Sequence, residues 1–288
     1  MSRNLEHWHQ HGHYIEVNGH RVFYRDEGAG PAILLIHGYP TASWDWNKIW
    51  QPLTEGYRCI ALDMLGFGFS DKPTRAYSIF EQADICVALL EHLEVSECHI
   101  VSHDYGDTVA QELLAKHNEG TLVAGIRSIV LLNGGIFPEV HQPVLIQKLF
   151  LSPIGGLLSR LMSRATLAKN FNAIFGADTP PSDQEIDEFW QLIAHNNGKR
   201  VMHRIISYMP ERRAHRERWV GALQSTDVPL RFVNGLADPI SGGHMVDRYA
   251  ELIPNADLVR LDNIGHYPQV EAPEAVLQSI REKLSAVN

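Results

Sequence analysis

A short run about a third of the way along the chain, Ser102-His103-Asp104-Tyr105-Gly106, constrains the fold more than any other feature. The apolar residues before it are typical of a buried strand, and the spacing of apolar residues after it is typical of a helix. A strand that turns directly into a helix crowds the backbone two positions before and after the turn, so both positions need small residues. Centred on Asp104 these are Ser102 and Gly106, whereas a turn centred on Ser102 would place Ile100 and Asp104 there. The sequence therefore predicts a sharp turn with a carboxylate at its apex.

The residue type at this apex indicates the chemistry. A serine would suggest acyl transfer, whereas an aspartate suggests attack on a saturated carbon through an alkyl-ester intermediate. No serine fits the apex, so a serine-type esterase is the least favoured activity. The plain alternative is that Asp104 only caps the N-terminus of the helix.

Composition bounds the class of protein. The chain has 288 residues, 44% of them hydrophobic and 20% charged, which is enough for one sizeable core. A formal net charge of −9 argues against nucleic acid or an anionic membrane surface as a partner. Three cysteines without metal-ligand spacing suit a reducing compartment. The polar N-terminus and the lack of a run of about 20 apolar residues predict a cytoplasmic protein without a membrane span.

Strands and helices alternate along most of the chain, which predicts a mostly parallel sheet with helices on both faces, an α/β fold. The alternation stops between residues 136 and 219, where the periodicity is helical. We therefore expect a core domain of residues 1–135 and 220–288, with a helical cap of residues 136–219 over the carboxyl edge of the sheet. The expected strands are 13–17, 21–25, 32–36, 57–62, 98–101, 126–132, 230–234 and 258–261, and expected core helices include 79–93 and 273–284.

Two further motifs complete a plausible catalytic triad. Asp238 follows a predicted strand directly before a proline, and His266 follows the last predicted strand. Asp238 could instead be a turn residue, and Asn133, at the end of a neighbouring strand, is not ionisable. The chain order of nucleophile, acid and histidine is that of α/β-hydrolases, whose first loop supplies an oxyanion-hole amide.

These motifs together resemble the α/β-hydrolases that use an aspartate nucleophile, from about Tyr14 to Leu284. The chain is also similar in its motifs to the mesoderm-specific transcript family. The matching runs are 37–40, 63–70, 102–106, 235–239 and 265–266 for the superfamily, and 102–113, 133–139 and 218–223 for that family.

The resemblance implies an aspartate-dependent hydrolase, either an epoxide hydrolase or a haloalkane dehalogenase. Dehalogenases typically have a tryptophan after the nucleophile, but Tyr105 stands there. Epoxide hydrolases use lid tyrosines as proton donors, and Tyr208 is the one tyrosine between residues 136 and 219. We therefore favour epoxide hydrolysis, with the backbone N–H groups of Tyr39 and Tyr105 as the oxyanion hole. The expected partner is a small apolar substrate, His37 and Trp190 are expected to line its pocket, and no metal or organic cofactor is implied.

Several features keep other interpretations open. A binding or signalling protein on a hydrolase fold is the alternative of another class. Residues 149–162 are apolar enough for a substrate tunnel or a membrane-touching lid, although a helix packed on the core is the plainer explanation. The arginines at 212, 213, 216 and 218 are expected on a solvated helix face. The histidines at 7, 9, 11 and 13 would share one face if extended, but a frayed polar terminus is favoured over metal binding.

Overall fold

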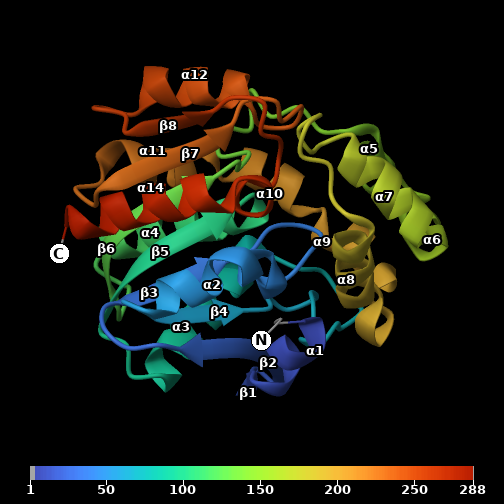
Figure 1. The fold of residues 1–288 in the computed structure, drawn as a ribbon, viewed down its shortest axis with the longest axis horizontal. Helices are drawn as coiled ribbons and strands as arrows, with labels where there is room; N and C mark the ends of the chain where they lie inside the picture. Colours follow the sequence, from blue (N-terminus) through green and yellow to red (C-terminus); the bar gives the residue numbers. More distant parts are fainter. Residues whose placement is uncertain (1–3, 288) are drawn as a thin grey trace.

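One eight-stranded sheet organises the fold in the computed structural model, which describes residues 4–287. Its strand order is β1-β2-β4-β3-β5-β6-β7-β8. The pairs β1–β2 and β2–β4 are antiparallel and all other neighbouring pairs are parallel, which confirms the predicted α/β fold (Figure 1). The strands are β1 His13–Val17, β2 His20–Glu27, β3 Ala32–Ile36, β4 Arg58–Leu62, β5 Glu97–His103, β6 Gly125–Leu132, β7 Leu230–Gly235 and β8 Leu258–Leu261.

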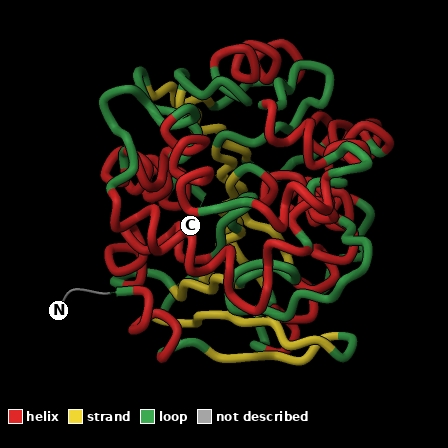
Figure 2. The backbone as a smooth tube through the Cα atoms, turned by 90° about the vertical axis from the view of Figure 1, so that its right-hand side faces the viewer, coloured by secondary structure: helices red, strands yellow, loops and turns green. Residues whose placement is uncertain are grey.

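The sheet runs between two layers of helices (Figure 2). Helices α2 and α14 contact each other in one group, while α4 contacts both α3 and α11 in another. The central strands are therefore buried on both faces, which explains why β3 and β4 read as continuous apolar runs. These helices are α2 Asn47–Thr54, α3 Ile79–His92, α4 Tyr105–Asn118, α11 Arg216–Ser225, α12 Gly243–Leu252, α13 Pro268–Glu271 and α14 Pro273–Ser285.

The segment between β6 and β7 contains helices and no strand among the described residues. Figure 1 shows α5 to α9 gathered at one side of the molecule. Helix α11 packs on α4, so the predicted boundary at residue 219 falls inside a helix that contacts the core. The division into a core and a cap stays a prediction. The helices are α5 Leu145–Phe150, α6 Gly155–Leu161, α7 Arg164–Asn172, α8 Asp183–Ala194, α9 Met202–Ile205 and α10 Tyr208–Ala214. None of the described helices is long and apolar enough to cross a membrane.

The N-terminus differs from the expected frayed segment. Helix α1 (Leu5–Gln10) begins the described chain, and its Trp8 is only 1% exposed. The Trp8 ring packs edge-on against Trp50 at 4.8 Å, and the guanidinium of Arg25 lies 4.7 Å from it. The prediction failed because two buried apolar residues are enough to dock a short helix among polar ones. The four histidines consequently do not share an extended face, since residues 7 and 9 are helical and residue 13 is in β1.

A buried carboxylate ties α11 to α4. Glu112 is 1% exposed, and it accepts hydrogen bonds from Arg218 Nε at 2.6 Å and from Trp219 Nε1 at 2.8 Å. Arg218 also pairs with Glu119, so this arginine does not lie on a purely solvated face. Because the Trp219 N–H is buried, it has no water to replace the Glu112 carboxylate.

We expect Glu112→Ala to lower the free energy of unfolding by about 3 kcal/mol, because it leaves the buried Trp219 N–H without an acceptor and removes the buried carboxylate that pairs with the half-buried Arg218. The matched control is Glu97→Ala. Glu97 is also paired with an arginine, but its side chain is 60% exposed, so its loss should cost less than about 1 kcal/mol. Urea unfolding followed by circular dichroism measures both. Equal losses would contradict the stabilising role of Glu112.

Candidate active site

The structure places Asp104 at the turn between β5 and α4, where the sequence predicts it. Its backbone has φ 49° and ψ −106°, a region that non-glycine residues rarely adopt, and its side chain is 2% exposed. A Cβ on Gly106 would lie 2.4 Å from the carbonyl oxygen of Ile36, so that position needs glycine. The Ser102 hydroxyl donates to Asp107 at 2.5 Å and is therefore occupied within the protein.

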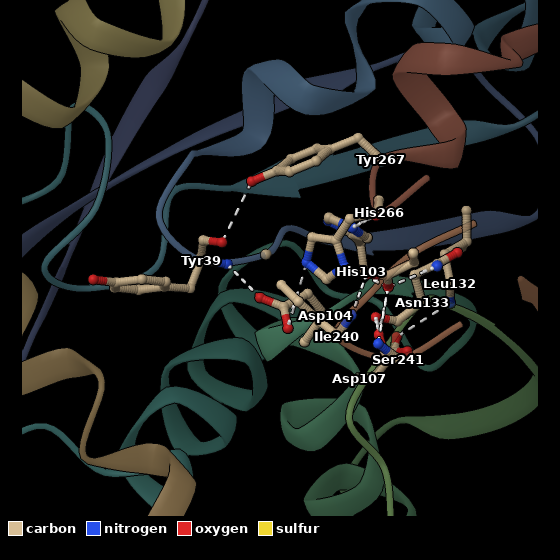
Figure 3. A network of polar contacts seen from close by, with 12 residues as sticks. Tyr39, His103, Asp104, Asp107, Leu132, Asn133, Ile240, Ser241, His266 and Tyr267 are labelled. Atoms are coloured by element: carbon tan, nitrogen blue, oxygen red, sulfur yellow. Dashed lines mark hydrogen bonds and ion pairs between the residues drawn. The ribbon is translucent and has the colours of Figure 1, made fainter. Parts of the chain in front are cut away.

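Asp104, Asp238 and His266 come together at the carboxyl edge of the sheet, after β5, β7 and β8. His266 Nδ1 lies 2.7 Å from Asp238 Oδ2, and His266 Nε2 lies 3.9 Å from Asp104 Oδ1. The imidazole therefore stands between the two carboxylates. Figure 3 shows His266 beside Asp104. This order of contacts is that of a nucleophile, a base and an orienting acid.

The Asp238 carboxylate is fully engaged in hydrogen bonds. It accepts from Asn133 Nδ2 at 3.0 Å, from the Ile240 N–H at 2.8 Å, and from the Ser241 N–H and hydroxyl at 3.2 and 2.8 Å. Asn133 and Ser241 were not predicted as partners. The bond to Ile240 is the usual aspartate turn, so the Asp-Pro sequence held a signal for it. Nothing in the sequence showed that Asn133 turns its amide toward Asp238.

The electrostatics of this group favour an ion pair. Burial raises the pKa of Asp238, but the neighbouring His266 and the hydrogen bonds outweigh it and lower the pKa to about 2. Burial likewise lowers the pKa of His266, but Asp238 and then Asp104 outweigh it and raise the pKa to about 9. Each carboxylate therefore stabilises the protonated imidazole.

The two oxygens of Asp104 have different surroundings. Oδ2 accepts a hydrogen bond from the Tyr39 backbone N–H at 3.0 Å (Figure 3). Oδ1 faces His266 and is the oxygen left for bonding elsewhere. Tyr105, the other predicted oxyanion residue, begins α4 directly after Asp104, and its ring is fully buried. The Tyr39 amide can therefore hold negative charge that develops on Oδ2.

Tyr208 lies beside this group at the start of α10. Its ring is 1% exposed and 4.8 Å from the Tyr105 ring, and its hydroxyl has no hydrogen-bond partner within residues 4–287. Burial raises the pKa of Tyr208, Asp104 raises it further, and Arg212 lowers it. The phenol is therefore protonated and free to donate.

Arg212 is the main surprise near the site. It is 2% exposed, not solvated as expected, and its guanidinium lies 4.7 Å from the Tyr208 ring centre. Its Nε donates to the Thr108 hydroxyl at 3.0 Å, while both terminal nitrogens have no partner in the described chain. Its Nη1 packs where a Cβ on Gly135 would be. The arginine turns inward because α10 lies against α4 and because position 135 has no side chain.

An apolar cavity of about 80 Å³ adjoins the group. Tyr39 and His266 line it from the sheet side, while Asp104 and Tyr208 are not among its lining side chains. The other lining residues come mainly from the segment between β6 and β7, and include Val144, Ile146, Gln147, Phe150, Met162, Leu167, Asn170 and Phe171. The site thus combines a polar constellation with an apolar chamber, which suits a small apolar molecule.

The two predicted pocket residues, His37 and Trp190, are not among the side chains that line this cavity. His37 is fully buried, and its Nε2 accepts a hydrogen bond from the Met64 N–H at 3.0 Å. Burial lowers the pKa of His37 to about 4, so it is a neutral structural acceptor. Trp190 lies in α8, where the ammonium of Lys199 sits 5.5 Å from its ring. Among the described residues, no group of three or more histidines, cysteines or acids could hold a metal ion.

The chain is similar over nearly its whole length to several known proteins. The mesoderm-specific transcript homolog protein of Bos taurus is 43% identical over 97% of this chain and 87% of its own. Haloalkane dehalogenase 2 of Mycobacterium bovis is 28% identical over 91% of each chain. The solved structure of the epoxide hydrolase CorEH shares the fold, with a TM-score of 0.80 at 19% identity over 96% of this chain and 99% of that one.

The predicted resemblance is therefore confirmed. Residues 31–273 match the family described as alpha/beta hydrolase fold, and the chain belongs to that family.

Proposed function

We propose that the protein is a hydrolase that uses Asp104 as a nucleophile and forms an alkyl-ester intermediate, with an epoxide as substrate and a diol as product. The observation that carries the proposal is the placement of Asp104, with Oδ2 on the Tyr39 amide and Oδ1 facing His266. A serine nucleophile lacks comparable support because the Ser102 hydroxyl is bound to Asp107. In this proposal residues 136–219 form the cap that encloses the substrate.

The first step is alkylation of Asp104. Its Oδ1 attacks an epoxide carbon, the carbon–oxygen bond of the ring breaks, and the new alkoxide takes the proton of the Tyr208 hydroxyl. Two features support this role of Tyr208. Its phenol has no competing partner within residues 4–287, and Arg212 beside its ring opposes the rise in pKa that burial causes.

The second step is hydrolysis of the ester. His266 takes a proton from a water, and the hydroxide attacks the carbonyl carbon of Asp104 while Asp238 stabilises the imidazolium. Negative charge then develops on Oδ2, which already lies on the Tyr39 amide, and a donor of this kind contributes roughly 3–4 kcal/mol. The intermediate collapses, the carbon–oxygen bond to the diol breaks, and the diol leaves with a proton from His266. The proton left on the Asp104 carboxyl then returns to the Tyr208 phenolate, which restores both groups.

Dehalogenation remains the second candidate. The similarity to a haloalkane dehalogenase extends over nearly the whole chain, and two amide side chains, Gln147 and Asn170, line the cavity where a halide could be held. Against it, the Asn170 amide already donates to Thr166 at 2.8 Å. The third candidate is a binding protein without catalytic activity. Binding alone does not require a nucleophile, a base and an acid to lie in this order.

Replacement of the base should stall the reaction at the ester. We expect His266→Gln to accumulate a covalent adduct on Asp104, because alkylation does not need the base but hydrolysis does. Intact mass spectrometry after mixing with epoxides and haloalkanes reads the adduct: a gain of a whole epoxide supports our proposal, and a gain of an alkyl group without its halogen supports dehalogenation.

Two variants control this trapping experiment. Adding Asp104→Ala to His266→Gln should abolish the adduct, and an adduct that persists would mean another nucleophile. Ser102→Ala in an otherwise unchanged protein should keep turnover, which distinguishes Asp104 from the serine two residues before it as the nucleophile. The absence of any adduct from either class of compound would favour the binding protein.

Replacement of Tyr208 distinguishes epoxide hydrolysis from dehalogenation. We expect Tyr208→Phe in the His266→Gln background to slow alkylation by epoxides by about 10²–10⁴-fold, because ring opening needs a proton donor. Alkylation by haloalkanes should change little, because a halide leaves without a proton. Rapid-quench mass spectrometry gives both rates, and an unchanged epoxide rate would rule out Tyr208 as the donor.

The pH dependence tests the role of the histidine. Because His266 must be neutral to act as a base and its pKa is raised to about 9, the hydrolysis step should speed up as the pH rises. Alkylation neutralises Asp104, so the midpoint in the ester should lie below about 9. Asp238→Asn should move this midpoint to lower pH and also slow the step, because in the ester Asp238 is the one carboxylate of this pair that still carries charge to hold the proton on His266. Ester decay in single-turnover experiments measures both effects, and an unmoved midpoint would contradict the assignment.

A further inference from the structure

Large apolar side chains that are well exposed gather in one part of the molecule. They lie on α5, on α6 and in the turn between them, and we call them the α5–α6 surface. Its members and their exposed fractions are Leu145 72%, Leu151 41%, Ile154 55%, Leu157 60% and Leu161 69%. In the rest of residues 4–287, only Tyr14 and Val123 are large apolar side chains with comparable exposure. Within residues 149–162, Phe150 and Met162 are buried as expected for a helix packed on the core, whereas Leu151, Ile154, Leu157 and Leu161 are not.

The charge of this region is opposite to that of the whole chain. The chain carries a formal net charge of −9, yet residues 140–176 contain no aspartate or glutamate. Lys148, Arg160 and Lys169 are exposed in this stretch and have no acidic partner within residues 4–287. Arg164 is the exception, since it pairs with Asp183 and Asp187. An apolar surface flanked by unpaired cations thus lies on an otherwise acidic protein.

The same helices form a wall of the cavity. Ile146, Gln147 and Phe150 of α5 line the cavity, as does Met162 just after α6, while the α5–α6 surface faces solvent. Figure 1 shows α5 and α6 at the outer edge of the molecule, on the far side from the sheet. One thin helical layer therefore separates the exposed apolar surface from an apolar chamber.

We propose that the α5–α6 surface docks on an anionic lipid bilayer. Short helices with leucines on one side and basic residues around them lie in the interface between lipid head groups and acyl chains. The cations near them add attraction to anionic lipids. The negative net charge of the whole chain would disfavour an anionic bilayer if the charge were evenly distributed. It is not, because residues 140–176 contain no acidic side chain.

A second copy of the chain is the weaker occupant. In a symmetric dimer the same patch contacts itself, which would bring Lys148, Arg160 and Lys169 against their own counterparts. An anionic lipid surface instead offers opposite charges to all of them. Docking of the α5–α6 surface on a bilayer would place the helices that form the cavity wall against the lipid, in which apolar molecules dissolve.

Flotation with lipid vesicles tests this proposal with the intact protein. We expect binding to vesicles of phosphatidylcholine containing phosphatidylglycerol, weak binding to phosphatidylcholine alone, and loss of binding as salt is raised. Leu157→Ser with Leu161→Ser should lower the partition coefficient by about tenfold or more, because both side chains leave the acyl boundary. Lys148→Gln and Arg160→Gln should each lower it by about fivefold.

Val123→Ser is the matched control. Val123 is 67% exposed but lies between α4 and β6, away from α5 and α6, so its replacement should leave binding unchanged. Equal melting temperatures of all variants show that folding is intact. Wild-type protein that fails to bind anionic vesicles overturns the proposal, as does a Leu157/Leu161 variant that binds equally well. If light scattering shows a wild-type dimer, the Leu157/Leu161 variant is monomeric and neither binds vesicles, the surface is instead an interface with a second copy of the chain. The assay reads binding alone, so it is independent of the proposed reaction.

Discussion

The crowded turn between β5 and α4 is the constraint on which the rest of the site depends. It holds Asp104 in a backbone conformation that its residue type disfavours, and it brings α4 so close to β3 that only glycine fits at position 106. The carboxylate is thereby presented to two other strand ends, which supply the Tyr39 amide and His266. A looser turn would leave the same residues in the sequence without bringing their reactive atoms into line.

Much of this arrangement can be predicted from the sequence because it depends on local rules. The strands at 32–36 and 258–261 were predicted to the residue, since apolar runs bounded by turns leave little choice. The first two strands were also predicted, and the turn between them has asparagine at 18 and glycine at 19, with φ of 52° and 76°. Asp104, Asp238 and His266 were predicted because each lies in the turn or loop that follows a strand.

The predictions failed for side chains whose positions depend on contacts with residues distant in the sequence. Arg212 sits in a polar helical stretch, and nothing local indicates that its side chain turns inward, because its place depends on Thr108 and Gly135. His37 follows a strand as the triad residues do, but the Met64 backbone captures its ring. Helix α1 could not be predicted from residues 5–10 alone, because Trp8 packs against residues between 43 and 50 that are distant in the sequence.

The walls of the cavity have a consequence for which molecules fit there. Most of the residues that line its volume of about 80 Å³ lie on α5, on α7 and in their neighbouring turns. The two carboxylates and the imidazole instead follow strands of the sheet. Substitutions in α5 and α7 can therefore change the size and shape of the molecule that the cavity accepts, while the turn at Asp104 and its partners stay in place.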